Sequence, residues 1–317
     1  MRTWAALAIV VAAACGGEVG LGPDGGAVDG GAVDGGVDAA PVDPLAGAGA
    51  VSPVGGGYRF TEGPQWRAAT ADWLWSDIDG DTIYRWTGAG APTVFRAPSG
   101  KSNGLALDPG GALIACEHGG RRVARGDGAS GVTVVDRFEG ARLNSPNDVT
   151  VRADGTIYFT DPPYGISAAQ RELGFMGVFR VAPGGALTAE HRGALTDRPN
   201  GVALSPTADR LYVGDSEAAT VHVFDVAADG ALANRRVFVT TAATPDGLAV
   251  DAAGDLFVAT AAGVEAYAPD GHRWGVLAIP EQPSNVAFGG ADGRTLLITA
   301  RTGVYRVELA VPGLPVR

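Results

Sequence analysis

The stretch "TPDGLAVDAAGDLFVAT", residues 244–260, decides the fold that this sequence predicts. It indicates a short strand, a Gly- and Asp-containing turn and a second strand, but it opens on Pro-Asp-Gly where a strand begins. Close copies of the unit recur along the chain. They are "SNGLALDPGGALIA" at 102–115, "PNDVTVRADGTIYFT" at 146–160 and "PNGVALSPTADRLYVG" at 199–214.

Six such units follow one another at intervals of 39 to 53 residues. Their opening residues are Glu62, Asn103, Asn147, Asn200, Asp246 and Asn285. A repeat of this length that is built from short alternating strands is typical of a β-propeller blade. The sequence therefore predicts an all-β, six-bladed β-propeller with four antiparallel strands in each blade.

The last blade reaches the C-terminal end of the sequence without a fourth strand. We expect "GGYRF", residues 56–60, to supply it, so that an N-terminal strand closes the ring. Closure would remove the exposed sheet edges that otherwise promote aggregation.

The innermost strand of a propeller blade lies along the central axis, so the six opening residues should converge at one mouth. All six carry side-chain oxygens. Two other interpretations stay open: Asn-Gly and Asp-Gly are common in hairpin turns, and a polar ring can simply be solvated. The hairpin interpretation is disfavoured because each unit already has another turn seven or eight residues later.

Carboxylates and amide oxygens without clustered Cys or His favour Ca²⁺ or Mg²⁺ over zinc or copper. We expect Ca²⁺, with another divalent cation as the alternative. Two short motifs resemble sites for other reactions, but the sequence around each of them does not match the motif's required context. Residues 100–104, "GKSNG", match a hydrolase nucleophile elbow, but a strand rather than a helix follows. The same "GKS" lacks the upstream glycine of a phosphate-binding loop.

The formal net charge of −11 argues against nucleic acid as a partner. Part of this acidity lies in a Gly- and Asp-rich stretch at 16–50, which has six acidic residues and no basic one. We interpret it as a disordered linker. An array of calcium-binding nonapeptides is the alternative, but the stretch lacks their regular pattern.

Residues 1–15 combine one Arg with an apolar run and end in small residues before Cys15. This pattern predicts an export signal, against the alternative of a fortuitous apolar start. The small residues before the cysteine resemble a lipoprotein signal, so Cys15 is a candidate lipid anchor. Residues 51–317 form the expected propeller, in an exported, periplasmic or envelope-anchored protein, or an extracellular one. Cys116 is the second cysteine, and we expect a buried thiol there.

Several motifs resemble the regucalcin and gluconolactonase family of calcium-dependent six-bladed propellers, in its bacterial gluconolactonase branch. They fall in order between residues 57 and 310: "TEGPQW", "SDIDGDTIYRW", "SGKSNGLALD", "ACEHGGRRV", "LNSPND", "TDPPYG", "RPNGVALSP" and "TPDGLAVD". At the position where the regucalcin branch has a substrate-binding arginine, two residues before Asn147, this chain has Ser145.

The resemblance implies a metal site formed by Glu62, Asn200 and Asp246, with Asn147 as a further ligand or substrate contact. It also implies that Asp246 is the acid/base. We expect Asn103, His118 and Tyr164 to contact the substrate. A bound cation stabilises the oxyanion of an attacked ester, which favours a lactonase that opens small sugar-derived lactones. The alternatives are a phosphotriesterase-like hydrolase and a non-catalytic propeller with calcium as a structural plug. The sequence does not predict an oligomeric state.

Overall fold

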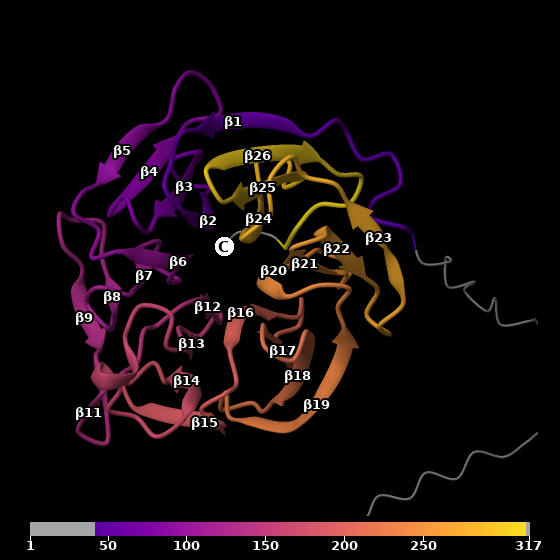
Figure 1. The fold of residues 1–317 in the computed structure, drawn as a ribbon. Coiled ribbons are helices and arrows are strands. Elements are labelled where there is room, and N and C mark those ends of the chain that lie inside the picture. Colours follow the sequence, from indigo (N-terminus) through magenta and orange to yellow (C-terminus); the bar gives the residue numbers. More distant parts are fainter. Residues whose placement is uncertain (1–41, 315–317) are drawn as a thin grey trace, which may run out of the picture. The chain divides into compact units, whose positions relative to one another are not determined.

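The computed structural model describes residues 42–314, and the expected signal and lipid-anchor segment with Cys15 lies outside them. Its main feature is a ring of six four-stranded antiparallel sheets (Figure 1). The predicted six-bladed propeller is therefore confirmed. The strands of the first three blades are β2 (Thr61–Arg67), β3 (Asp72–Asp77), β4 (Thr82–Trp86) and β5 (Thr93–Arg96); β6 (Ser102–Leu107), β7 (Leu113–Glu117), β8 (Arg122–Arg125) and β9 (Val132–Val135); and β12 (Val149–Val151), β13 (Ile157–Asp161), β14 (Met176–Val181) and β15 (Leu187–Gly193).

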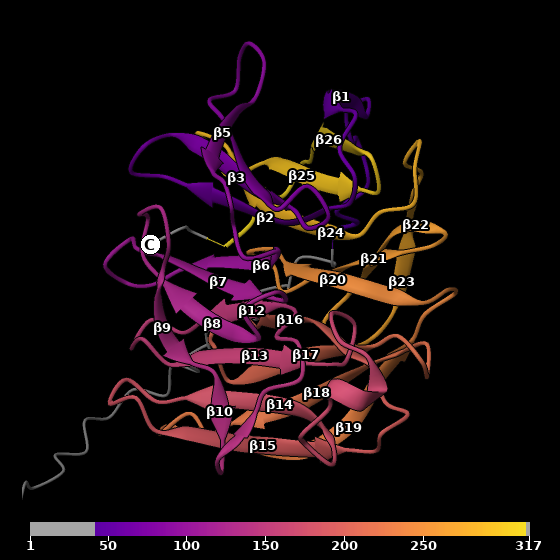
Figure 2. The ribbon, with the colours of Figure 1, turned by 60° about the vertical axis from the view of Figure 1, so that its left-hand side comes forward.

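The other three blades complete the ring and include the strand that closes it. They are β16 (Pro199–Leu204), β17 (Arg210–Asp215), β18 (Thr220–Val226) and β19 (Leu232–Thr240); β20 (Pro245–Val250), β21 (Leu256–Thr260), β22 (Gly263–Tyr267) and β23 (Arg273–Leu277); and β24 (Asn285–Gly289), β25 (Thr295–Ala300), β26 (Gly303–Glu308) and β1 (Ser52–Gly56). Figure 2 shows the blades from the side, with β1 beside β26.

Closure by an N-terminal strand is confirmed, but the bounds that we predicted for it, residues 56–60, were wrong. The closing strand is β1, which pairs with β26 and places Ser52 opposite Arg306. The following residues instead cross to the first blade. There the ring of Tyr58 packs against Trp75 and Tyr84, with centroid distances of 5.9 and 4.8 Å. Tyr58 is half-buried there, against a cluster that includes Trp75 of the first blade and Val304 of the sixth.

Hydrophobic side chains from the flat faces of neighbouring blades form the core. One cluster joins the second and third blades through Ile114, Phe159 and Phe179, and another joins the fifth and sixth through Phe257 and Ile298. The alternation of apolar residues in the repeated units directs these side chains to the blade faces. The core is thus a ring of interfaces that holds the inner strands in fixed positions.

Buried hydroxyl groups add a polar connection between blades, close to the axis. Ser76 Oγ on β3 donates to the carbonyl oxygen of Asn103 at 2.8 Å, and Thr160 Oγ1 on β13 donates to that of Asn200 at 2.6 Å. In both cases the second strand of one blade binds the opening residue of the next. The hydroxyls therefore fix the backbone from which the polar ring projects.

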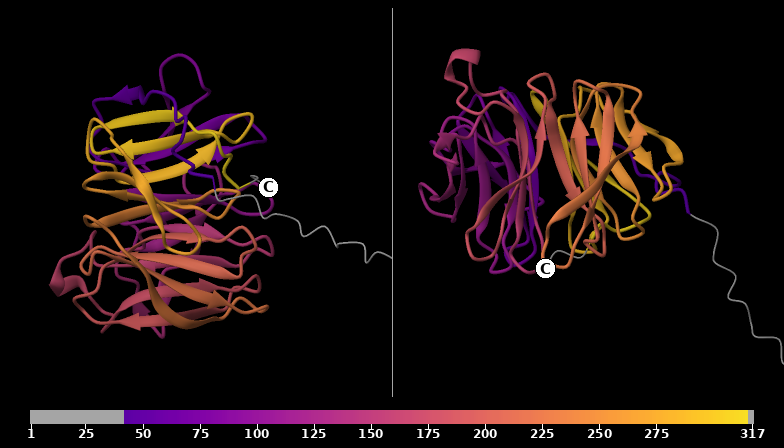
Figure 3. Two further views of the ribbon diagram at one scale, coloured as in Figure 1. Left: turned by 90° about the vertical axis from the view of Figure 1, so that its right-hand side faces the viewer. Right: turned by 90° about the horizontal axis from the view of Figure 1, so that it is seen from below.

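Two further features lie outside the repeated pattern. A hairpin of β10 (Arg137–Phe138) and β11 (Ala141–Arg142) and the 3-10 helix η1 (Ala168–Gln170) belong to connecting segments. Residues 42–50 fall within the expected linker, yet Leu45 and Ala48 pack against the sixth-blade core. Figure 3 shows the ring of blades from two further sides. Over residues 42–314, no helix is long and apolar enough to cross a membrane.

Candidate active site at the propeller mouth

The six opening residues are placed by the ends of the inner strands. Four of those strands have a register shift at this point, for example between Pro199 and Val202 on β16 and between Pro245 and Leu248 on β20. A bulge of this kind turns a side chain out of the sheet pattern. Asn200 and Asp246 lie within these two bulges, so the bulges direct them out of the regular alternation.

The glycine after most opening residues is explained by close packing at the axis. A Cβ on Gly201 would lie 2.3 Å from the carbonyl oxygen of Asp246, and one on Gly104 would lie 2.7 Å from that of Asn147. Neither glycine has a positive φ. Asn-Gly is therefore not a hairpin turn here: the glycine lets neighbouring inner strands approach each other.

A chain of hydrogen bonds joins the predicted asparagines. Asn103 Nδ2 donates to Asn147 Oδ1, and Asn147 Nδ2 donates to Asn200 Oδ1 at 2.6 Å. Asn200 Nδ2 continues the chain to Ser216 Oγ at 3.0 Å. On the other side of the ring, Asn285 Nδ2 donates to Glu62 Oε2 at 3.1 Å. The structure thus brings the asparagines of successive blades into contact, as their positions in the repeat predict.

The acidic residues at the axis influence one another strongly. Burial, followed by the charges of Asp246 and Asp148, raises the pKa of Glu62 well above its usual range. Burial and the charge of Asp148 raise the pKa of Asp246 to about 7, whereas a hydrogen bond from Asn200 and the charge of Arg301 oppose the shift. The two predicted carboxylates therefore share one electrostatic environment.

Asp148 is the residue of this environment that we did not predict. It is buried and accepts a hydrogen bond from Val202 N at 3.0 Å through Oδ2. Burial raises its pKa to about 6. A sequence signal existed: in four units glycine follows the opening residue, and only the third unit has an acid there.

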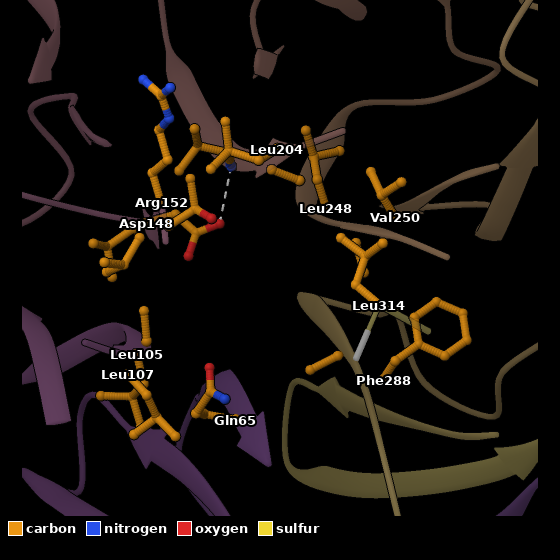
Figure 4. A pocket seen from close by; sticks show the side chains of 18 of the residues that line it. Gln65, Leu105, Leu107, Asp148, Arg152, Leu204, Leu248, Val250, Phe288 and Leu314 are labelled. Atoms are coloured by element: carbon orange, nitrogen blue, oxygen red, sulfur yellow. Dashed lines mark hydrogen bonds between the residues drawn. The ribbon is translucent and has the colours of Figure 1, made fainter. Parts of the chain in front are cut away.

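Asp148 also lines a cavity that runs along the axis below the ring. The cavity has a volume of about 370 Å³ and is lined mainly by aliphatic side chains of the inner strands, together with Leu314 from the segment after β26. In Figure 4, the carboxylate of Asp148 stands among Leu105, Leu204 and Leu248. A carboxylate in apolar surroundings is poorly solvated, which explains why the pKa of Asp148 is raised.

His118 and Tyr164, the two predicted substrate contacts from the loops, are placed differently. His118 is buried, and its Nε2 lies 3.1 Å from Asn103 Nδ2. Burial lowers its pKa to about 4, so its imidazole is neutral at pH 7. Tyr164 is 47% exposed. Partial burial raises its pKa, with Ser216 and Asp246 as close neighbours.

Ser145, at the position where the resemblance leads one to expect arginine, has a structural role in this chain. Its side chain is fully buried, and Oγ accepts a hydrogen bond from Gly165 N at 3.0 Å. Its own backbone N–H donates to Asp161 Oδ1 at 2.8 Å. Ser145 therefore holds the loop that carries Tyr164.

The ring was tested for its fit to a divalent cation. Within residues 42–314 no three His, Cys, Asp or Glu side chains form a metal-binding group by themselves. A cation would need the amide oxygens as well. Asn103 Oδ1 is buried without a hydrogen-bond partner, and in the described part of the chain Glu62, Asp148 and Asp246 have no ion-pair partner. Buried, uncompensated carboxylates beside amide oxygens fit a hard cation.

The fold and the site together define a six-bladed propeller that presents oxygen ligands and a neutral imidazole at the mouth of its axis. The chain belongs to the SMP-30/Gluconolactonase/LRE-like region family, whose model matches residues 60–302. This confirms the family resemblance.

Individual relatives agree with this membership. The chain is 33% identical over 282 residues to a gluconolactonase of Zymomonas mobilis, covering 79% of this chain and 78% of the relative. A Xanthomonas campestris gluconolactonase structure superposes with a TM-score of 0.78 and 33% identity over 84% of this chain and 91% of the other. The calcium-binding protein regucalcin of Agrobacterium tumefaciens shares the fold at a TM-score of 0.66 and 22% identity, over 83% and 92% of the two chains.

Proposed function

We propose that this protein is a divalent-cation-dependent lactonase that opens small sugar-derived lactones, with Ca²⁺ as its cation. The observation that carries the proposal is the convergence of Glu62 and Asp246 with a hydrogen-bonded series of asparagines at one mouth. The relatives named gluconolactonase support the choice of reaction. Glu62, Asn147, Asn200 and Asp246 would hold the cation, because carboxylate and amide oxygens are the ligands that Ca²⁺ takes.

The cation, when bound, would polarise the lactone carbonyl and stabilise negative charge on its oxygen. The chain's own residues supply the proton transfers. Asp246 would accept a proton from the attacking water and return it to the departing ring oxygen. Asn200 lies beside this carboxylate and opposes the rise in its pKa, which favours the charged form that can accept a proton.

The remaining mouth residues would bind the substrate. Asn103 and His118 form a buried pair, and a neutral imidazole can donate or accept hydrogen bonds with sugar hydroxyls. Tyr164 projects from a loop over the same mouth and offers a phenol hydroxyl together with an apolar ring. A polyhydroxylated lactone matches this set of polar groups.

The decisive experiment compares the wild-type protein with Asp246→Asn and a matched control, Asp225→Asn. Asp225 lies on the outer half of the fourth blade and pairs with Arg236 at 2.7 Å. We expect the wild type and the control to hydrolyse D-gluconolactone with Ca²⁺ and to lose activity with a chelator, and we expect Asp246→Asn to be inactive. Calcium binding without turnover of any lactone or phosphotriester would instead favour a structural plug.

We also propose, from the sequence of residues 1–15 alone, that the protein is exported and that Cys15 is its lipid anchor. Metabolic labelling with a radioactive fatty acid tests this proposal. Label on the wild type and not on Cys15→Ser supports the anchor, whereas equal labelling of both contradicts it.

A further inference from the structure

Arg301 lies on the same face of the ring as Glu62, and the proposed reaction gives it no role. It begins the two-residue turn between β25 and β26, in which Ala300 pairs with Gly303. Its carbonyl oxygen accepts a hydrogen bond from Thr61 N at 2.8 Å. Thr61 immediately precedes Glu62, so the turn is attached to the start of the first inner strand.

The guanidinium of Arg301 is held in place on two sides. It stacks over the ring of Phe60, 5.0 Å from the centroid, and NH2 donates to Gln282 Oε1 at 2.9 Å. The turn itself is fixed by Glu281, which accepts hydrogen bonds from Thr302 N and Oγ1 at 2.8 and 2.9 Å. An arginine restrained in this way loses less conformational entropy when it binds a ligand.

The backbone of Arg301 is strained, with a φ of +44°. A side chain other than Gly, Asn or Asp is uncommon in this region, and such strain often accompanies a functional position. The turns between the second and third strands of three other blades also place a residue in this region: Asp81, Arg121 and Ala219, with φ of 50°, 53° and 51°. The conformation therefore belongs to the repeated turn, and the role of Arg301 is argued from its side chain.

The charge of Arg301 is not neutralised by a neighbour. Of the ion pairs among residues 42–314, none involves Arg301, although Arg67, Arg122 and Arg180 are all paired with acids. Its charge acts on Asp246, where it opposes the rise in pKa that burial and Asp148 cause. A fixed, unpaired guanidinium with free N–H donors is suited to bind a carboxylate.

We propose that Arg301 is a specificity-determining residue that recognises an anionic group on the substrate, so that the preferred lactones carry a free carboxylate. This inference rests on the proposed lactonase function and names its substrate class. Ser145 cannot serve as a cation at this mouth, and Arg301 supplies one from a different blade. Monolactones of aldaric acids have the required chemistry, because one carboxyl is esterified in the ring and the other is free.

The test uses two lactones that differ only at C6, D-glucaro-1,4-lactone with a carboxylate and D-glucono-1,4-lactone with a hydroxymethyl group. The ratio of their kcat/KM values is measured for the wild type, Arg301→Gln, Arg301→Lys and the control Arg306→Gln. Arg306 is a good control because it is exposed on the same blade and also stacks on an aromatic ring, 5.4 Å from the centroid of Trp86.

We expect the wild type to prefer the glucarolactone and Arg301→Gln to reduce this preference at least tenfold, through KM rather than kcat. Arg301→Lys should restore part of the preference, and Arg306→Gln should leave it unchanged. An equal ratio in the wild type and Arg301→Gln would overturn the inference.

A wild type that hydrolyses neither lactone would refute the lactonase proposal separately. In that case, the affinity of the wild type and of Arg301→Gln for D-glucarate would be measured by calorimetry to test the role of Arg301. Weaker binding by Arg301→Gln than by the wild type would retain anion recognition, and equal affinity would refute it.

Discussion

At the scale of single residues, the site depends on charges that the protein buries without a cationic partner. Burial raises the pKa values of Glu62, Asp148 and Asp246, and the charge of Asp148 adds to the rise at Glu62 and Asp246. The positions of Glu62 and Asp246 followed from the repeat, because opening residues must meet at the axis. The role of Asp148 could not be predicted in this way, because Asp148 follows an opening residue and the repeat does not specify where the side chain of that next residue lies.

Asp148→Asn should weaken Ca²⁺ binding about tenfold, equivalent to ~1.4 kcal/mol. The substitution removes a buried negative charge near the proposed ligands, while the amide oxygen can still accept the hydrogen bond from Val202 N. Isothermal titration calorimetry at pH 7.5 measures the change. Asp292→Asn, at an exposed position, is the control, and equal affinities for both variants would contradict the prediction.

The metal-free protein should become less stable as the pH rises from about 4 to about 7. The folded-state pKa of Asp246 is about 7 against an ordinary value of 3.8, so in this interval the folded state binds more protons than the unfolded state. Thermal unfolding in a chelator should therefore give a higher Tm at pH 6 than at pH 8. Added Ca²⁺ should raise Tm more at pH 8, and a larger effect at pH 6 would refute this explanation.

At the scale of elements, the strands of the repeated units could be predicted from the sequence, whereas the bounds of the closing strand could not. The alternation of apolar residues and the turn after each inner strand were sufficient to predict the blades. The closing strand was misplaced because β1 contains Pro53, Gly55 and Gly56 and has little strand character. The aromatic "YRF" looks more like a strand, but Tyr58 is bound by interblade contacts instead.

Gly201→Ala should destabilise the protein by about 1–3 kcal/mol or more, because the new Cβ would overlap the Asp246 carbonyl oxygen in a packed axis. It should also impair cation binding, since Asp246 would have to move. Gly184→Ala is the matched control, with no atom within 4 Å of the added Cβ. Chemical denaturation of both variants is the measurement. Equal stability of the two would show that the inner strands tolerate a wider separation.

At the scale of the whole molecule, the ring is held closed by β1. The strand completes the sixth blade and covers the edge of β26. The sequence was sufficient to predict six blades and closure. It could not give the relative heights of the mouth loops, so Tyr164 was predicted as a substrate contact only from its place after an inner strand of the third blade, and no role was predicted for Arg301.

A chain that begins at Gly57 should aggregate, whereas one that begins at Val42 should stay monodisperse. Removal of β1 exposes the β26 edge, which can pair with another chain. Size-exclusion chromatography with light scattering distinguishes the two. A monodisperse chain from Gly57 would show that β1 is dispensable for closure.

The arrangement of the sixth blade also has a consequence for the order of folding. Thr61 Oγ1 donates to the carbonyl oxygen of Gly303, a contact between residues 242 positions apart, and β1 pairs with β26 at a similar separation. Contacts this distant in sequence form slowly. A growing chain can assemble its middle blades as they emerge, but it cannot complete the sixth until nearly all residues are available. The pairing of β1 with β26 must therefore wait until the residues of β26 have been synthesised, although β1 is among the first strands to be made.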